Sequence, residues 1–152
     1  TVRMTAAGRV GWISDAQGYR YAKTHPNGQP WPPTPPALAA IWDDLAEWGA
    51  GADTCLLNYY DEQSKMGMHQ DSDEADLRAP VVSISLGDSA LFRIGGLTRS
   101  GPTQSILLES GDAIVMGGPA RLRYHGIDHI RFGSSTLLPQ GGRLNFTLRV
   151  AT

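Results

Sequence analysis

From Cys55 onward, apolar and polar residues alternate with a period of two within short runs. The runs are rich in β-branched and aromatic residues, and turn signals such as Gly87-Asp88 and Gly117-Gly118-Pro119 separate them. A period of two matches a strand with one buried face. The expected strands are 55–60, 81–86, 90–94, 104–109, 112–116, 121–125 and 143–150.

This number of short strands favours a two-sheet jelly roll over an open meander. Residues 10–23 are expected to add one or two strands. The chain has 152 residues, of which 41% are hydrophobic. That is enough for one core and too short for a two-domain Rossmann enzyme or a full TIM barrel. Jelly rolls commonly hold a ligand or a metal ion between their sheets.

The segment before the first of these runs has a different pattern. Residues 29–36 read QPWPPTPP and must be extended, because proline lacks the amide donor and restricts the residue before it. Apolar residues then recur at steps of three and four over 37–50, with Pro36 at the expected first turn. This spacing predicts one amphipathic helix with Trp42 and Trp48 on its buried stripe.

Cysteine content and charge indicate the compartment and the kinds of partner that we expect for this chain. Cys55 is the only cysteine and lies in an apolar run, so we expect a buried, reduced thiol and a cytoplasmic protein. No apolar stretch is long enough to cross a membrane, and no membrane partner is expected. The net charge of −2 argues against a general polyanion binder. Basic residues gather in 1–31 and 121–152, and these two ends could form a binding surface beside a metal site.

His69-Gln70-Asp71 places an imidazole and a carboxylate on the same face of an extended segment. Alone this pattern is weak, because Asp71 also begins an acidic run that could simply be solvated. His125, on a late expected strand, supplies a second imidazole. Two histidines and one carboxylate can hold Fe(II) with open positions, although zinc hydrolases use similar ligands. His129 is an alternative third ligand that spacing does not exclude.

The last expected strand, 143–150, carries a polar row. Alternation puts these side chains on one face: Arg143, Asn145, Thr147 and Arg149. Turned inward, two guanidinium groups need anions, whereas an edge strand would leave the row in solvent. The two arginines are about 20 Å apart along the strand, so one could bind an anion while the other orients metal-bound groups. Asn58 and Tyr60 alternate in the same way and could supply neutral donors.

With these residues in view, the chain resembles the AlkB-type Fe(II)/2-oxoglutarate-dependent dioxygenases, which repair alkylated nucleic acid bases. The resemblance runs from about Gly11 to Arg149 and rests on an ordered set of motifs. They are GWISDAQGYRY (11–21), PWP (30–32), CLLNYY (55–60), HQDSDEADLRAPVVSISLG (69–87), GGLTR (95–99), GDAIVMGG (111–118), YHGI (124–127) and RLNFTLR (143–149). Two positions depart from the pattern: Ser72 stands for a lysine and Met116 for a tryptophan.

The resemblance implies a mainly β fold, a double-stranded β-helix or jelly roll, with an N-terminal substrate lid and one or two supporting helices. Residues 1–152 would form a single dioxygenase domain. Within it, 1–36 would be a nucleotide-recognition lid and Pro-rich linker, 37–50 a supporting helix, and 54–152 the jelly-roll core.

The resemblance also implies roles for individual residues. The metal ligands, and hence the catalytic residues, would be His69, Asp71 and His125. Arg143 would pair with the distal carboxylate of 2-oxoglutarate. The other residues around the co-substrate would be Tyr60 and Asn145 beside Arg143, and Asn58 and Arg149 nearer the metal.

Substrate recognition is implied for a separate group of residues. Trp12, Tyr19 and Tyr21 match the family's lid, and Trp12 would stack on the flipped base opposite His69. Asp73 would contact the polar edge of the base, and Arg99 the lesion strand or the base pocket.

The implied activity is oxidative demethylation of N-alkylated bases, of the 1-methyladenine and 3-methylcytosine type, as direct reversal DNA repair. The reaction would use Fe(II), O2 and 2-oxoglutarate and release succinate, CO2 and formaldehyde. We expect a monomer that acts on alkylated DNA, with single strands preferred and RNA as a further substrate. Two alternatives remain: an oxygenase acting on a protein, lipid or small molecule, and a non-catalytic jelly-roll binding module.

Overall fold

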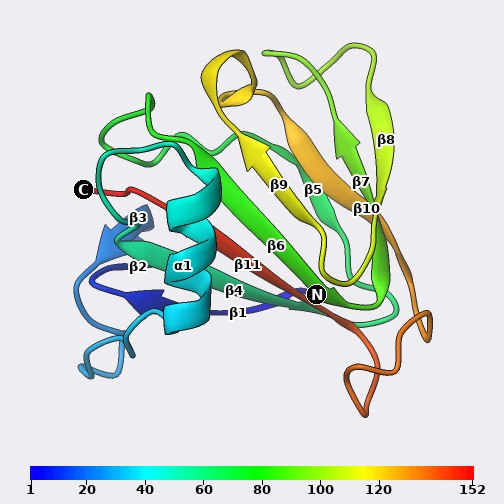
Figure 1. Cartoon of the computed structure of the whole chain (residues 1–152), viewed down its shortest axis with the longest axis horizontal. Coiled ribbons are helices and arrows are strands. Elements are labelled where there is room, and N and C mark those ends of the chain that lie inside the picture. Colours follow the sequence, from blue (N-terminus) through cyan, green and yellow to red (C-terminus); the bar gives the residue numbers. More distant parts are fainter.

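Two antiparallel β-sheets face each other in the computed structural model, which describes residues 1–152 (Figure 1). The five-stranded sheet has the order β1 (Arg3–Gly8), β4 (Thr54–Tyr60), β11 (Arg143–Arg149), β6 (Val81–Gly87) and β9 (Ala113–Met116). The four-stranded sheet has the order β5 (Met66–His69), β10 (His125–Arg131), β7 (Ser89–Ile94) and β8 (Gln104–Leu108). Such crossovers between non-consecutive strands confirm the expected jelly roll.

The strand predictions from alternation are confirmed for most segments, and one is wrong. The sequence predicts a strand over 121–125. In the structure these residues follow a short 3-10 helix, η1 (Gly118–Ala120), and β10 begins only at His125. Arg121 and Arg123 mimic an alternating strand, yet both side chains turn inward and donate to backbone carbonyls. Alternation did not predict β1, whose first three residues are exposed, or β5, which has only four residues.

A ten-residue helix, α1 (Pro36–Leu45), covers the outer face of the larger sheet (Figure 1). Trp42 is its most buried residue, at 1% exposure, and its indole nitrogen donates to the carbonyl of Ala50 at 3.0 Å. The helix ends before residue 50, because Glu47 takes a left-handed conformation with φ of 51°. Trp48 still packs against the same cluster from beyond the helix end.

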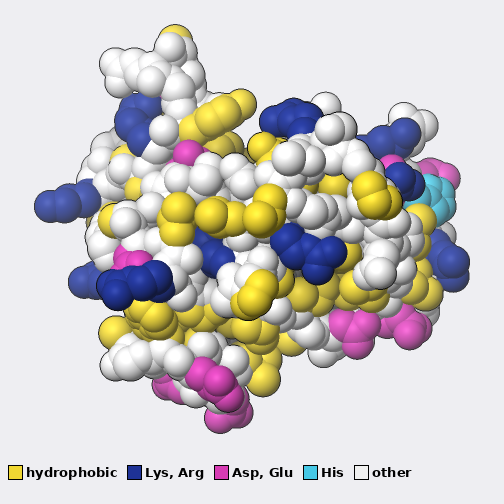
Figure 2. Space-filling view, turned by 90° about the horizontal axis from the view of Figure 1, so that it is seen from above, with side chains coloured by type: hydrophobic (Ala, Val, Ile, Leu, Met, Phe, Trp, Pro, Cys, Tyr) yellow, Lys and Arg dark blue, Asp and Glu magenta, His cyan; other side chains and the backbone are white.

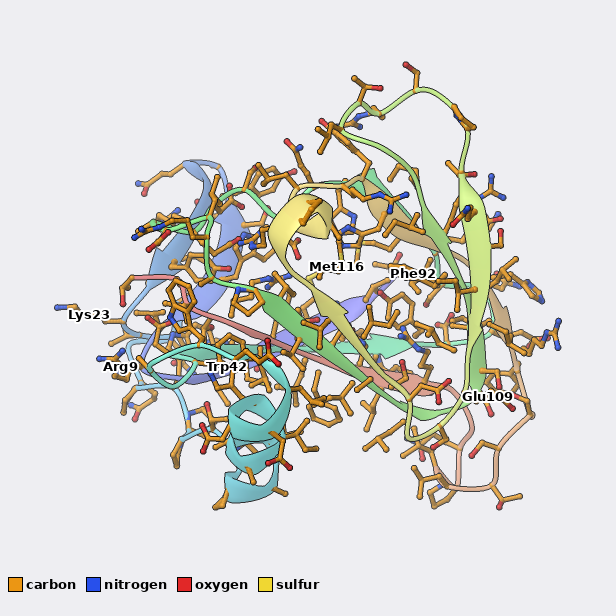
Figure 3. All side chains as sticks on the ribbon, turned by 45° about the horizontal axis from the view of Figure 1, so that its top comes forward. Arg9, Lys23, Trp42, Phe92, Glu109 and Met116 are labelled. Carbon is orange, nitrogen blue, oxygen red and sulfur yellow. The ribbon has the colours of Figure 1, made fainter.

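A second core fills part of the space between the two sheets. Figure 3 shows Phe92 from β7 and Met116 from β9 pointing into this space, and both are buried. Tyr60 from β4 joins them from the larger sheet. The rest of the space between the sheets is not filled by side chains and forms a cavity.

A two-stranded hairpin, β2 (Gly11–Asp15) with β3 (Gly18–Ala22), stands beside the larger sheet (Figure 1). The Pro-rich segment anchors its base, because the Trp31 ring lies against Gly11 and the indole nitrogen donates to the carbonyl of Ala22 at 2.8 Å. A Cβ at position 11 would lie 2.3 Å from the Trp31 ring. The contact therefore requires glycine.

The first strand lies within the expected lid segment 1–36. Residues 3–8 pair along their whole length with β4 and so belong to the larger sheet.

No helix in the structure is long and apolar enough to span a membrane.

Cys55 on β4 is a free, fully buried cysteine beneath α1, as expected from its apolar run. Burial raises the pKa of its thiol to about 12, against the opposing effect of Arg149. We predict that at pH 8 a disulfide reagent such as DTNB modifies the folded protein on the order of 10³ times more slowly than the urea-unfolded protein, since the thiolate is scarce. Equal rates would contradict the burial.

Candidate active site

The pairing of β5 with β10 brings two histidines together. His69 and His125 are register partners across the two strands, and their ring centroids are 4.4 Å apart. The strands approach closely at this point, because a Cβ on Gly126 would lie 2.5 Å from the carbonyl oxygen of Met66. The glycine after His125 therefore permits the pairing that sets the two rings side by side.

Backbone carbonyls orient both imidazole rings. The Nδ1 atom of His69 lies 2.8 Å from the carbonyl oxygen of Gly67, and that of His125 lies 3.1 Å from the carbonyl oxygen of Arg123. A carbonyl only accepts, so each Nδ1 carries the hydrogen and each Nε2 presents a lone pair. Burial lowers the pKa of His125, although Asp71 opposes the shift. The neutral ring that a metal ligand requires is therefore favoured.

Asp71 lies where both Nε2 atoms point. Its carboxylate oxygens are 3.7 Å from Nε2 of His69 and 3.9 Å from Nε2 of His125, and all three candidate ligand atoms lie within 4.8 Å of one another. Asp71 is only 8% exposed, so it is not part of a solvated acidic run. Burial alone would raise the pKa of Asp71, but Arg149 at 3.2 Å, together with the histidines, lowers it.

The donor set of two imidazoles and one carboxylate fits a divalent metal and leaves positions open for other ligands. Such a set suits Fe(II) and also zinc, so the groups around it must decide the chemistry. His129 is exposed, pairs in register with Leu91, and does not line the cavity.

The polar row of β11 faces the cavity from the middle of the larger sheet, between β4 and β6, rather than from an edge. Arg143 is 1% exposed, and its Nη2 donates to the Ser85 hydroxyl at 2.9 Å. Its guanidinium carbon lies 5.1 Å from the centre of the Tyr60 ring. Burial lowers the pKa of Arg143, against the opposing effect of Tyr60.

Several buried polar atoms on this wall have no partner. They include Nε and Nη1 of Arg143, Nε of Arg149 and Oδ1 of Asn58. Leaving such groups unpaired in the interior is costly, most of all for charged ones. A guanidinium that offers unused donors into a cavity fits a carboxylate ligand, so the residues present suit 2-oxoglutarate beside a metal.

The cavity has a volume of about 490 Å³, within the range of small-molecule sites. Every residue that the family resemblance named for the metal, the co-substrate or the base contributes to its lining, whereas the alternative ligand His129 does not. Ser72 and Met116, the two departures from the family pattern, line it as well.

The hairpin β2–β3 forms one side of the cavity mouth. The Trp12 and Tyr19 rings stack with centroids 5.3 Å apart, and the Trp12 indole nitrogen donates to the Asp73 carboxylate at 3.0 Å. The Tyr21 hydroxyl donates to Glu74 at 2.7 Å. On the other side, the Arg99 guanidinium lies 5.6 Å from the centre of the Tyr124 ring.

Comparison with known proteins decides which chemistry these groups serve. The family model described as the 2OG-Fe(II) oxygenase superfamily matches residues 1–149. The chain belongs to this superfamily. It is therefore an Fe(II)- and 2-oxoglutarate-dependent dioxygenase that uses O2, as its donor set and unpaired arginine donors suggest.

Two relatives match nearly the whole chain of the dioxygenase. An alpha-ketoglutarate-dependent dioxygenase AlkB homologue of Caulobacter vibrioides is 56% identical over 152 residues, which cover 99% of this chain and 69% of that protein. The alpha-ketoglutarate-dependent dioxygenase AlkB of Escherichia coli is 43% identical over 157 residues, covering 99% and 72%. The structure of OsALKBH1 superposes with a TM-score of 0.84 at 30% identity and covers 97% of this chain and 77% of that one.

Sequence reasoning missed two residues next to the dioxygenase site. Glu74 lies in the acidic run after Asp71, yet it is 7% exposed and lines the cavity. Arg121 lies in the segment expected to be a strand and is 3% exposed. No local pattern separates them from solvated charges, because their partners lie far along the chain.

The position of His129 allows a direct test of the metal ligands. We predict that His125→Ala weakens Mn(II) binding more than about 100-fold, since it removes a ligand rather than a supporting group. His129→Ala is the matched control and should change the affinity less than about twofold. Titration calorimetry of the metal-free variants measures both affinities. Loss of binding in the control alone would assign the ligand to His129.

Proposed function

We propose that this dioxygenase removes N-alkyl groups from nucleic acid bases by oxidation, as direct reversal of alkylation damage. The observation that carries the proposal is the lid. An aromatic side chain that is fixed to a carboxylate, Trp12 with Asp73, stands over the same cavity as the candidate metal ligands. The resemblance to AlkB-type dioxygenases supports the same substrate class.

In this proposal His69, Asp71 and His125 hold Fe(II). Arg143, with Tyr60 and Asn145 beside it, binds the distal carboxylate of 2-oxoglutarate. Fe(II) held there would supply the activation of O2, with one oxygen atom entering succinate as 2-oxoglutarate loses CO2 and the other oxidising the N-methyl group, which leaves as formaldehyde and restores the base.

Groups nearer the metal have a different task. A guanidinium nitrogen of Arg149 lies 3.2 Å from the Asp71 carboxylate. Burial alone would lower the pKa of Arg149, but Asp71 and the other neighbouring groups raise it. It therefore stays charged and keeps Asp71 ionised. Asn58, whose side-chain oxygen is unpartnered, lies on the same wall and completes the co-substrate pocket.

The base must leave its stack to reach the cavity, because its methyl group is inaccessible within a helix. Trp12 and Tyr19 are stacked on each other and offer a flat apolar surface for the base, while Asp73 can accept a hydrogen bond from its amino edge. Lesions on the Watson–Crick edge, such as 1-methyladenine and 3-methylcytosine, are already unpaired. They therefore cost least to extrude.

Single-stranded DNA is the preferred form in this proposal, with RNA as a further substrate. The face shown in Figure 2 carries Lys and Arg side chains spread over it rather than gathered in one patch. With a net charge of −2, the chain lacks the excess positive charge that tracking two phosphate backbones favours. Tyr21 and Arg99 lie at the mouth, where they can contact the flanking strand.

One chain suffices for the proposed reaction. A single copy supplies the lid, the metal ligands and the co-substrate pocket, so we propose that residues 1–152 act as a monomeric unit. Within it, the hairpin and Pro-rich segment up to residue 36 form the lid, and α1 supports the jelly-roll core. The chain's single, buried Cys55 forms no disulfide, which supports our proposal of a cytoplasmic enzyme.

The experiment is release of formaldehyde and succinate with Fe(II), ascorbate and 2-oxoglutarate, with and without a single-stranded oligonucleotide that carries 1-methyladenine. Both products should depend on the methylated oligonucleotide. We predict that Trp12→Ala raises the KM for this oligonucleotide about tenfold or more, since stacking on a base is worth roughly 1–3 kcal/mol.

Phe132→Ala is the matched control for the lid variant. Phe132 is also an exposed aromatic residue, at 44%, but it does not line the cavity, so its KM should stay unchanged. Succinate without formaldehyde would point instead to an oxygenase with a protein, lipid or small-molecule substrate. The absence of both products would favour a binding module.

A further inference from the structure

A buried arginine outside the cavity holds the segment that follows the first metal ligand. Arg121 lies in the turn after η1, and its guanidinium makes a different contact from each nitrogen. Nε donates to the carbonyl of Ala79 at 2.7 Å, Nη1 to the carbonyl of Asp71 at 2.5 Å, and Nη2 to the Glu74 carboxylate at 2.6 Å. One side chain therefore contacts the backbone of Asp71 and the side chain of Glu74.

Glu74 continues this connection to the lid. Its other carboxylate oxygen accepts a hydrogen bond from the Tyr21 hydroxyl at 2.7 Å, and Tyr21 lies on β3 of the hairpin. The side chains of Arg121 and Glu74 are only 3% and 2% exposed. A continuous path of short contacts thus runs from Tyr21 through Glu74 and Arg121 to Asp71.

The second link between hairpin and core is weaker. Both hydrogen bonds have a carboxylate acceptor, but the Trp12–Asp73 bond is exposed to solvent, whereas the Tyr21–Glu74 bond is partly buried. Hydrogen bonds to charged groups in sheltered settings contribute more than exposed ones. Tyr21 is therefore the principal contact that seats the hairpin above its anchored base.

A buried ion pair is not an efficient way to stabilise a fold, because its desolvation cost offsets most of the attraction. The arrangement around Arg121 has a more specific property, since its planar fork matches acceptors that lie in different directions. A lysine keeps the charge but cannot reach all of them. Geometry rather than charge is what this arginine supplies.

We propose that Arg121 is a positioning residue that couples the seating of the lid to the placement of Asp71. The inference rests on the proposed function for the meaning of the lid, but the coupling itself is a property of the metal site and the hairpin. Coupling is reciprocal: if a seated hairpin favours the metal-binding geometry, a bound metal must favour the seated hairpin to the same degree.

The test measures that reciprocity in the full chain without any nucleic acid. Trypsin cleavage after Arg20, followed by mass spectrometry, reports how often the hairpin leaves its seat, since Arg20 lies within β3, paired in register with Ile13, and the strand must come free to enter the protease. Cleavage rates are compared with and without saturating Co(II), a redox-stable substitute for Fe(II).

We expect Co(II) to slow cleavage at Arg20 of the unmodified protein about fivefold or more, the usual lower range of coupling between sites. In Arg121→Lys the ratio of the two rates should fall to about one, although the charge is retained. Tyr21→Phe removes only the peripheral hydroxyl, so it should fold normally and also bring the ratio to about one.

Ile130→Val is the control for a general loss of stability. Ile130 is 2% exposed in the core between the sheets and contacts none of these groups, so this variant should lower Tm and keep the full Co(II) effect. Persistence of the Co(II) effect in Arg121→Lys, or its absence from the unmodified protein, would overturn the coupling. A failure to demethylate bases would leave this result unchanged and would concern the proposed function alone.

Discussion

The site depends on the position of β11 in the middle of the five-stranded sheet. Because side chains alternate along a strand, one face of β11 packs Leu148 beneath α1 while the other turns Arg143 and Arg149 into the cavity. A slip of this strand by one residue would exchange these faces and break its pairing with both β4 and β6. The same ladder that closes the core therefore fixes the charged wall of the site.

The charged wall of the cavity costs folding free energy, because several of its buried polar atoms have no hydrogen-bond partner. Arg143 and Arg149 are buried with donors that nothing in the protein uses, and such groups destabilise a fold that is otherwise well packed. The pairing of β11 with β4 and β6 nevertheless holds both arginines on the face that lines the cavity. An anionic co-substrate would satisfy these donors, so binding should add stability that folding alone lacks.

Much of this fold was predictable from the sequence because its strands are amphipathic. The alternation within the short strands predicted the jelly roll and the polar row of β11, but it left open whether that row faces inward or into solvent. The helical spacing predicted α1, apart from its end. The strand expected at 121–125 was wrong because Arg121 and Arg123 are pinned to carbonyls from distant segments. Alternation in sequence cannot distinguish side chains in solvent from side chains held by a remote partner.

The same limit of local pattern applies to the candidate functional residues. His69 and Asp71 were visible from local spacing, whereas Glu74 was indistinguishable from a solvated acid because its partners come from far along the chain. The resemblance to a family named the lid residues, which alternation alone would have assigned to the core of a hairpin. Local pattern thus pointed to candidate ligands, and only tertiary structure revealed Glu74 between Arg121 and the hairpin.

Trp31 fixes one end of the hairpin. It packs against the end where Gly11 pairs with Ala22, so any displacement of the hairpin must grow toward the opposite end, where Asp15 pairs with Gly18. Trp12 lies close to the fixed end, and Tyr19, which is 69% exposed, lies close to the free end. Trp12 therefore lies where the hairpin moves least, and the end that carries Tyr19 keeps the most freedom to adapt to its surroundings.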